Sequence, residues 1–340
     1  MRLIVRVARL LPAFRRLQDR LDQFASDNGR LERLVAQQRE ALAKLRQQRG
    51  TDPDIRHLLE QQAKDRADGR LVEFEYPYRP HVRDWDTLPR GNVYRQLLAQ
   101  GEASYRTILE GFLSFADQFS GISVTGSPDD TSPYWDNGWL PVLDGISIYG
   151  MLATKNPRYY FEVGSGNSTK FARKAIQDHN LRTRIISVDP QPRANIDTIC
   201  DEVIRCGLEN VDLARFVELG REDILFIDNS HRSFQGSDVT VFFTEVLPTL
   251  GEGCIYGIHD ILLPGDYPRD WLQRFYNEQY LLMAYLLGGA GGDEILLPVS
   301  YVYMNRQLAS ALDPITALPV QHGAPGNGSI FWMRRGPSLA

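Results

Sequence analysis

Two short stretches of the sequence combine glycines, small polar residues and an acid in a way that suits a ribose-bearing ligand. In YYFEVGSGNST (159–169) an apolar run turns at Gly164 and Gly166 into a polar segment that can open a helix. Glycine lets a ligand approach the backbone, and the free N–H groups of a helix start favour an anionic group. A second apolar run, 184–188, ends at Asp189, whose carboxylate could hold two ribose hydroxyls. Together they predict a site for a nucleoside-bearing cofactor.

Two cofactor classes fit this outline. A nicotinamide dinucleotide site has the pattern G-x-G-x-x-G with an acid about 20 residues later, but here Thr169 takes the third glycine position and Asp189 comes late. The pattern E-x-G-x-G, with an acid closing the next strand, resembles the class I, Rossmann-like S-adenosylmethionine-dependent methyltransferases. An ordinary strand-to-helix turn of an α/β protein is the structural alternative. The resemblance implies S-adenosyl-L-methionine as the cofactor and these cofactor-binding residues: Glu162, Gly164, Ser165, Gly166, Asn167, Ser168, Asp189 and Asp228.

Two later apolar runs also end in polar chemistry, in FIDNSH, which closes at His231, and in IHD, which closes at Asp260. These motifs resemble the D-x-x-H and following acidic motifs of small-molecule and sugar O-methyltransferases related to the macrolide-sugar methyltransferases. The resemblance implies Asp228 and Asp260 as ligands of a magnesium-type ion and His231 as the general base. His259 stands where those relatives carry Glu. Because imidazole is a poor ligand for Mg²⁺, three alternatives are open: the metal keeps more water ligands, a softer ion such as Mn²⁺ is used, or no metal is needed.

Alternating apolar runs and helical patterns predict an α/β fold with a doubly wound, mostly parallel, Rossmann-like sheet. Ligands of such sheets bind beyond the carboxyl ends of the strands, where all of these polar motifs fall. The resemblance implies seven strands with an antiparallel closing strand. The predicted strands are 159–163, 184–188, 202–205, 224–227, 254–258, 294–303 and 329–334. The predicted helices include 57–67, 140–149, 236–247 and 271–287, and residues 90–119 also have helical spacing. The resemblance implies contacts with the adenine near 208–211.

A loop ahead of the first strand carries Tyr134, Trp135 and Asp136. Aromatic and polar groups at this place could contact the acceptor or close over the cofactor, and we predict them as substrate residues. The structural alternative is that Trp135 and Trp139 fill the core.

Composition narrows the class of protein. The chain has 340 residues, of which 43% are hydrophobic, enough to bury a core. Three cysteines without metal-type spacing argue against a disulfide framework. No apolar run approaches the roughly 18 residues of a membrane span, and the first eleven residues lack a signal cleavage pattern. We therefore expect a cytoplasmic protein.

The N-terminal region differs in charge from the rest of the chain. Residues 1–50 hold 12 Lys and Arg against 5 Asp and Glu, net +7, while the remaining 290 residues hold 26 against 38, net −12. Apolar residues recur at a mean spacing of 3.5, which predicts a long coiled-coil helix and a homo-oligomer. The seam is Leu10, Phe14, Leu17, Leu21, Phe24, Asn28, Leu31, Val35, Gln38, Leu42 and Leu45. A single amphipathic helix is the alternative.

The first sixteen residues mix apolar side chains with five arginines, a pattern that could lie on the inner face of a membrane or simply begin the helix. Without interleaved aromatics they do not indicate a nucleic-acid partner. We divide the chain into a helical coiled coil (1–70), a linker with a helical cap (71–130) and a Rossmann-like methyltransferase domain (131–340).

The function predicted from these features is methyl transfer from S-adenosylmethionine to a hydroxyl of a sugar, glycan or glycosylated small molecule. Three alternatives remain open: a non-methylating, hydroxylase-type member of the same fold, a coiled-coil scaffold whose α/β domain only binds a partner, and a nicotinamide oxidoreductase.

Overall fold

The computed structural model describes residues 36, 37, 39, 53–69, 71, 72 and 74–337. The chain divides into two units, Met1–Arg79 and Pro80–Ala340. The predicted heptad seam, residues 10–45, lies outside the described residues apart from positions 36, 37 and 39, and so does the whole basic N-terminal segment. Among the helices that the structure describes, none has both the length and the apolar character needed to cross a bilayer.

In the first unit, helix α2 (Pro53–Ala67) ends where the sequence predicts the end of helical structure. The described residues of 71–80 form no helix or strand, as expected for a proline-containing linker.

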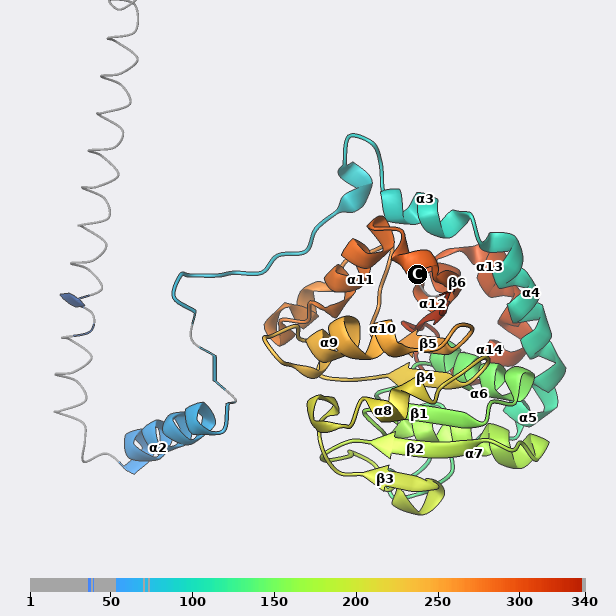
Figure 1. The fold of residues 1–340 in the computed structure, drawn as a ribbon, viewed down its shortest axis with the longest axis horizontal. Helices are drawn as coiled ribbons and strands as arrows, with labels where there is room; N and C mark the ends of the chain where they lie inside the picture. Colours follow the sequence, from blue (N-terminus) through green and yellow to red (C-terminus); the bar gives the residue numbers. More distant parts are fainter. Residues whose placement is uncertain (1–35, 38, 40–52, 70, 73, 338–340) are drawn as a thin grey trace, which may run out of the picture. The chain divides into compact units, whose positions relative to one another are not determined.

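The second unit is built on a seven-stranded sheet with the order β3-β2-β1-β4-β5-β7-β6 (Figure 1). Strands β1 to β5 pair in parallel, and β7 is antiparallel to both of its neighbours. This confirms the predicted mostly parallel sheet with an antiparallel closing strand. The strands are β1 (Tyr159–Val163), β2 (Arg184–Val188), β3 (Glu202–Ile204), β4 (Ile224–Ile227), β5 (Ile255–Ile258), β6 (Glu294–Pro298) and β7 (Phe331–Arg334).

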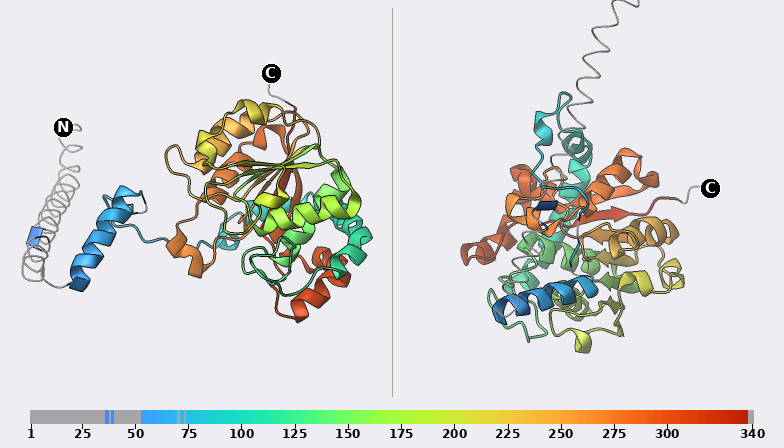
Figure 2. Two further views of the ribbon diagram at one scale, coloured as in Figure 1. Left: turned by 90° about the horizontal axis from the view of Figure 1, so that it is seen from below. Right: turned by 90° about the vertical axis from the view of Figure 1, so that its left-hand side faces the viewer.

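Helices cover both faces of the sheet, which explains why its central strands are apolar on both sides. All four residues of β4 and of β5 are buried. Figure 2 shows α6 and α7 on one face and the helices α8 to α10 on the other. The helix before the first strand is α6 (Val142–Lys155). The helices that follow the central strands are α7 (Asn167–His179), α8 (Ala214–Val217), α9 (Asp238–Val241), a π-helical turn (Phe242–Val246), α10 (Leu247–Thr249) and α11 (Glu278–Leu287).

Further helices precede the first strand and lie between the last two. They are α3 (Val93–Ala99), α4 (Glu102–Phe112), α5 (Ala116–Ser120), α12 (Val299–Met304), α13 (Arg306–Ala309) and α14 (Asp313–Gln321). Tyr105, Leu109 and Phe112 of α4 belong to the same buried cluster as the sheet. The predicted boundary at residue 130 stays a prediction, although α3 to α5 share this core.

Two predicted elements are interrupted by tertiary contacts. The predicted helix 271–287 is a 3₁₀ helix, Arg269–Arg274, and then α11, separated by Phe275 in a left-handed conformation (φ 55°). The break places the backbone N–H of Asn277 2.9 Å from the carbonyl oxygen of His231. The predicted strand 294–303 ends at Pro298 and continues as α12, where the Val299 N–H donates to Ile330 O. Local propensity did not reveal either contact.

The turn after β1 lies against the end of β4. Gly164 has φ +79°, and a Cβ built on it would lie 1.7 Å from the carbonyl oxygen of Asp228. Only glycine fits this position, because a side chain would clash with the backbone and strain the left-handed conformation.

Gly164→Ala is expected to lower the free energy of unfolding by at least about 2 kcal/mol. Gly166→Ala is the matched control, because its added Cβ meets nothing within 4 Å. Urea denaturation of the two variants provides the measurement. Equal stabilities would show that β1 and β4 do not approach as closely as described.

Candidate active site

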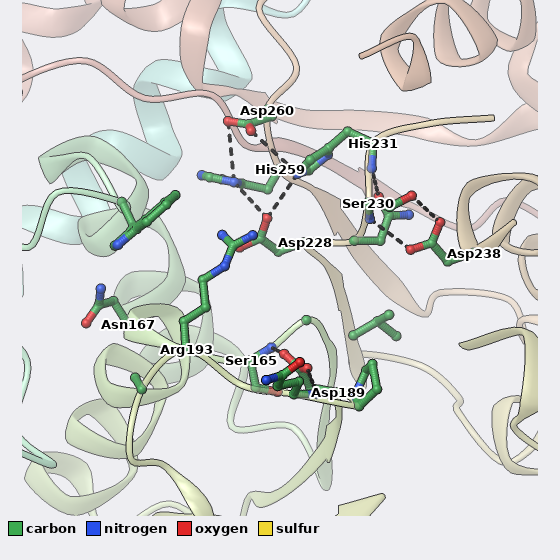
Figure 3. Close-up of a pocket in the computed structure, with 18 of the residues that line it drawn as sticks. Ser165, Asn167, Asp189, Arg193, Asp228, Ser230, His231, Asp238, His259 and Asp260 are labelled. Atoms are coloured by element: carbon green, nitrogen blue, oxygen red, sulfur yellow. Dashed lines mark hydrogen bonds and ion pairs between the residues drawn. The ribbon is translucent and has the colours of Figure 1, made fainter. Parts of the chain in front are cut away.

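A cavity of about 580 Å³ opens at the carboxyl ends of β1, β2, β4 and β5 (Figure 3). It is lined by the residues that directly follow these strands, which is where the sequence predicts the site. They include Gly164, Ser165, Gly166, Asn167, Asp189, Asp228, His231, His259 and Asp260.

Asp189 is held at one end of the cavity by backbone N–H groups. Ser165 N–H donates to Asp189 Oδ2 at 2.9 Å, and Gln191 N–H donates to Oδ1 at 2.7 Å. Each oxygen retains lone-pair capacity for a ligand hydroxyl. The segment 207–209 also lines the cavity, in the region where the sequence predicts adenine-side contacts. This end therefore offers hydrogen-bond acceptors of the kind that ribose hydroxyls need.

Glu162 and Ser168 are fully or almost fully buried and do not line the cavity. Glu162 accepts hydrogen bonds from the hydroxyl groups of Thr169 and, at 3.2 Å, Tyr160. Burial raises the pKa of Glu162 to about 7, although these hydrogen bonds oppose the shift. Its place in the structure is beneath the glycine turn, and its predicted contact with the cofactor stays a prediction.

His231 lies on the cavity floor between three carboxylates. Its Nδ1 is 2.9 Å from Glu278 Oε2, and its Nε2 is 3.3 Å from Asp228 Oδ1 and 3.5 Å from Asp260 Oδ2. Glu278 also accepts a hydrogen bond from Asn229 Nδ2 at 3.1 Å. The wholly buried Glu278 therefore orients the ring so that Nε2 faces the two aspartates at the cavity.

His259 makes a second contact with the same carboxylate. Its Nδ1 lies 3.2 Å from Asp228 Oδ1 and 3.5 Å from Asp260 Oδ1 (Figure 3). Its Nε2 is 3.3 Å from Asp144 Oδ2, but without hydrogen-bond geometry. Asp144 instead accepts from the backbone N–H groups of Ser329 and Ile330. Asp228 is thus shared by two buried imidazoles.

The electrostatics of this cluster follow from its composition. Burial alone would lower the pKa of His231, but its hydrogen bonds to Asp228 and Glu278 outweigh burial and raise that pKa well above its usual value. The pKa of His259 is raised in the same way by Asp228 and Asp260. Conversely, the two imidazoles hold the pKa of Asp228 well below its usual range despite the cost of desolvation.

Three non-glycine residues around the floor have left-handed backbone conformations: His231 (φ 58°), Asp260 (φ 56°) and Phe275 (φ 55°). Such conformations are unfavourable for these residue types and are concentrated at functional sites. They mark this floor as the centre of the site.

The predicted substrate residues separate into three environments. Tyr134 lines the cavity. Trp135 is packed in the core against Phe119 and Phe171, so the structural alternative describes its position. Asp136 is exposed and lies outside the lining, because its backbone is held by Val124 O. The neighbouring Asn137, which sequence reasoning did not select, does line the cavity and receives Asn167 Nδ2 at 3.3 Å.

The structure adds other residues that the sequence did not indicate. Glu278 is distant in sequence from His231 and carries no motif. Arg193, Trp271, Arg274 and Tyr276 line the cavity and come from segments read as loop or plain helix. The weak signal for the last three was an Arg between aromatic residues in WLQRFY.

The donor atoms fit a divalent cation of borderline softness. Asp228, His231 and His259 offer ligand atoms that lie within 4.8 Å of one another, and Asp260 lies beside both imidazoles. Two nitrogen donors with carboxylate oxygen suit Mn²⁺, Fe²⁺ or Zn²⁺ better than Mg²⁺. Asp228 and Asp260, predicted as ligands, are therefore joined by His259, and also by His231 in a site where its Nε2 does not act as a base.

Comparison with known families identifies the central segment. Residues 161–261 match the family model described as "Methyltransferase domain". The match covers 101 of the 340 residues, so it identifies a methyltransferase domain in this segment and not over the whole chain. It spans the glycine turn, Asp189 and the floor of the cavity. The predicted methyltransferase class, with S-adenosylmethionine as its cofactor, is thereby confirmed.

Several solved structures are loosely similar to the chain. The plantazolicin methyltransferase BpumL in complex with SAH is 11% identical, with 72% of this chain and 99% of that chain covered and a TM-score of 0.36. The mycolic acid cyclopropane synthase CmaA1 complexed with SAH and CTAB is 11% identical, with coverages of 68% and 98% and a TM-score of 0.32. Cofactor-bound Rv0187 from MTB is 12% identical, with coverages of 68% and 90% and a TM-score of 0.29. No curated protein matches the chain significantly.

Mn²⁺ is expected to bind the protein at least about tenfold more tightly than Mg²⁺, because two of the donors are imidazoles. Asp228→Asn is expected to abolish this binding, whereas Asp270→Asn, an exposed site outside the lining, serves as the matched control. Calorimetric titration of the full chain with each ion measures the difference. Equal affinities for the two ions would contradict the prediction that imidazole nitrogens coordinate the metal.

The raised pKa of Glu162 predicts that the free energy of unfolding depends on pH. Its folded pKa of about 7 exceeds the usual 4.5, so between these values the folded state keeps a proton that the unfolded state has released. Raising the pH through this window therefore destabilises the fold, by on the order of 3 kcal/mol in total.

Glu162→Gln keeps the shape of the side chain but cannot ionise, so its stability relative to wild type should improve as pH rises from 5 to 8. Denaturant unfolding of the two proteins across this range checks the prediction. A stability difference that does not change with pH would show that Glu162 ionises normally.

Proposed function

We propose that the protein transfers the methyl group of S-adenosylmethionine to a hydroxyl of a sugar, glycan or glycosylated small molecule, with His231 as the general base. The observation that carries the proposal is the position of His231, whose Nδ1 is fixed by the buried Glu278 at 2.9 Å while its Nε2 faces the cavity aspartates. An oriented imidazole at the floor of a cofactor cavity suits removal of a hydroxyl proton.

The cofactor is proposed to lie along the rim from Asp189 to the glycine turn. Asp189 would accept the ribose hydroxyls, with 207–209 beside the base. Ser165, Gly166 and Asn167 would face the methionine part, because they line the cavity where α7 begins. This order leaves the methyl group toward the floor and the acceptor near His231.

Methyl transfer needs the acceptor oxygen in line with the sulfonium methyl carbon. Positioning of this kind supplies on the order of 7–11 kcal/mol in favourable cases. As the new C–O bond forms and the C–S bond breaks, the hydroxyl proton passes to Nε2 of the neutral form of His231. A cation held by Asp228 and Asp260 would favour that neutral form, because it would offset the two carboxylates that raise the pKa of the imidazole. Asp228, Asp260 and His259 would hold a divalent cation, which when bound lowers the pKa of a coordinated hydroxyl.

A hydroxylase-type reaction is the second candidate. Asp228, His231 and His259 together offer two imidazoles and one carboxylate, the donor set of non-haem iron oxygenases. Oxygen consumption dependent on Fe²⁺, without methyl transfer, would favour it.

The proposal extends to the oligomeric state of the enzyme and its location in the cell. A cytoplasmic homo-oligomer joined by the coiled coil, with its basic N-terminus at the inner face of a membrane, follows from the seam and the charge of residues 1–50. Sedimentation measurements that compare the oligomeric state of the full chain with that of a chain lacking residues 1–50 test whether the coiled coil joins the subunits.

His231→Asn is expected to reduce turnover by about 10²- to 10⁴-fold, the usual contribution of general base catalysis. Asparagine tolerates the left-handed backbone of this position, which limits structural damage. Binding of S-adenosylhomocysteine, measured by calorimetry, should stay within about twofold of wild type because His231 lies at the acceptor side. Methyl transfer is assayed from labelled S-adenosylmethionine to a panel of sugars and glycosides.

His322→Ala is the control, because His322 is exposed and outside the cavity. NAD serves as the control ligand. Full activity of His231→Asn would rule out the base assignment. Binding of NAD in place of the sulfur cofactors would overturn the proposed chemistry.

A further inference from the structure

A cationic and aromatic cluster borders the cavity next to His231. We call it the rim cluster and define it as Arg232, Trp271, Arg274 and Tyr276. The guanidinium carbon of Arg274 lies 4.4 Å from the ring centroid of Trp271 and 5.6 Å from that of Tyr276. Trp271, Arg274 and Tyr276 all line the cavity. The exposed charge of Arg274 is thus held on two rings.

Arg232 brings a second guanidinium to the same place. It lies 5.2 Å from the Tyr276 centroid, and its Nε donates to the carbonyl oxygen of Arg274 at 2.8 Å. One of its terminal nitrogens donates to Ser230 O at 3.1 Å. These backbone contacts fix Arg232 beside Arg274, so that two positive charges share Tyr276.

The fold ties the rim cluster to the proposed base. The Tyr276 ring centroid is 4.7 Å from that of His231. The N–H of Asn277 donates to His231 O, and the left-handed Phe275 separates Arg274 from Tyr276 in the chain. A molecule bound on the rim cluster would therefore reach His231.

These guanidinium groups differ from the structural arginines of the fold. Arg158, Arg173 and Arg335 each form an ion pair with an aspartate at 2.5–2.6 Å. Within the described part of the chain, neither Arg232 nor Arg274 forms an ion pair with a carboxylate. A guanidinium stacked on aromatic faces, as that of Arg274 is, keeps its N–H edge available, and that edge matches phosphate or carboxylate. Arg232 donates to carbonyl oxygens from Nε and one terminal nitrogen, which leaves its other terminal nitrogen for a ligand.

We propose that the rim cluster binds an anionic group, phosphate or carboxylate, of the acceptor. The inference rests on the proposed methyl transfer and names its substrate class as an anionic sugar or glycan. Trp271 and Tyr276 offer flat apolar surface to the sugar ring, while Arg274 and Arg232 bind the anion. Because Arg274 and Arg232 hold the anion on the rim, the reacting hydroxyl can point to His231.

Calorimetry on the full chain saturated with S-adenosylhomocysteine tests this assignment. The probes are inorganic phosphate, glucose, glucose 6-phosphate and glucuronate. Phosphate and at least one anionic sugar are expected to bind wild type at least about tenfold more tightly than glucose binds it. Comparison of glucose 6-phosphate with glucuronate identifies which anion is preferred.

Arg274→Gln and Arg232→Gln are expected to weaken anion binding by about tenfold each, the loss of one charged contact. Arg269→Gln is the matched control, since Arg269 lies on the same 3₁₀ helix, is exposed and is outside the cavity lining. It should bind as wild type does.

Glucose binding as tightly as the anionic sugars, or anion binding unchanged in both Arg274→Gln and Arg232→Gln, would overturn the assignment. Loss of S-adenosylhomocysteine binding in Arg274→Gln would also overturn it, because the arginine would then serve the cofactor. A different result would contradict the proposed methyl transfer itself. In that case wild type would bind the anions but transfer no methyl group to any anionic or neutral acceptor.

Discussion

The close approach of the turn after β1 to the end of β4 is the constraint on which the site depends. A Cβ at Gly164 would lie 1.7 Å from Asp228 O, so the two strand ends meet only because this residue is glycine. The approach brings the cofactor side of the cavity, with Ser165 and Asp189, next to the floor that Asp228 begins. A wider separation would move Ser165 and Asp189 away from the imidazoles.

The floor is an arrangement of opposite charges taken partly out of water. Asp228 contacts both His231 and His259, and each imidazole has a further carboxylate behind it, Glu278 or Asp144. Buried charges persist only when they are paired, and removal of one partner leaves the other at a cost of several kcal/mol. The same ion pairs orient the imidazole rings, so these residues are needed both for the stability of the fold and for the geometry of the site.

The two sides of the cavity differ in chemistry, and this supports the proposal that one side binds the cofactor and the other binds the acceptor. The side formed by β1 and β2 offers a carboxylate held by backbone N–H groups, suited to ribose hydroxyls. The other side, formed by the segment between β5 and α11 together with Arg232 after β4, offers arginines on aromatic rings. The family match covers 161–261 and so ends at the floor. The rim cluster lies mostly beyond this segment, where an acceptor preference can vary without altering the cofactor site.

The sequence by itself determined the sheet, the glycine turn and the residues at the strand ends, because strand patterns and strand-end motifs are local in the chain and parallel strands bring their ends to one edge. It predicted Asp189, Asp228, His231, His259 and Asp260 for this reason. Only the tertiary structure decided that Glu278 orients His231, that Trp135 is core, and that the helix predicted for 271–287 breaks at Phe275. These outcomes depend on contacts between residues far apart in sequence, which no local pattern records.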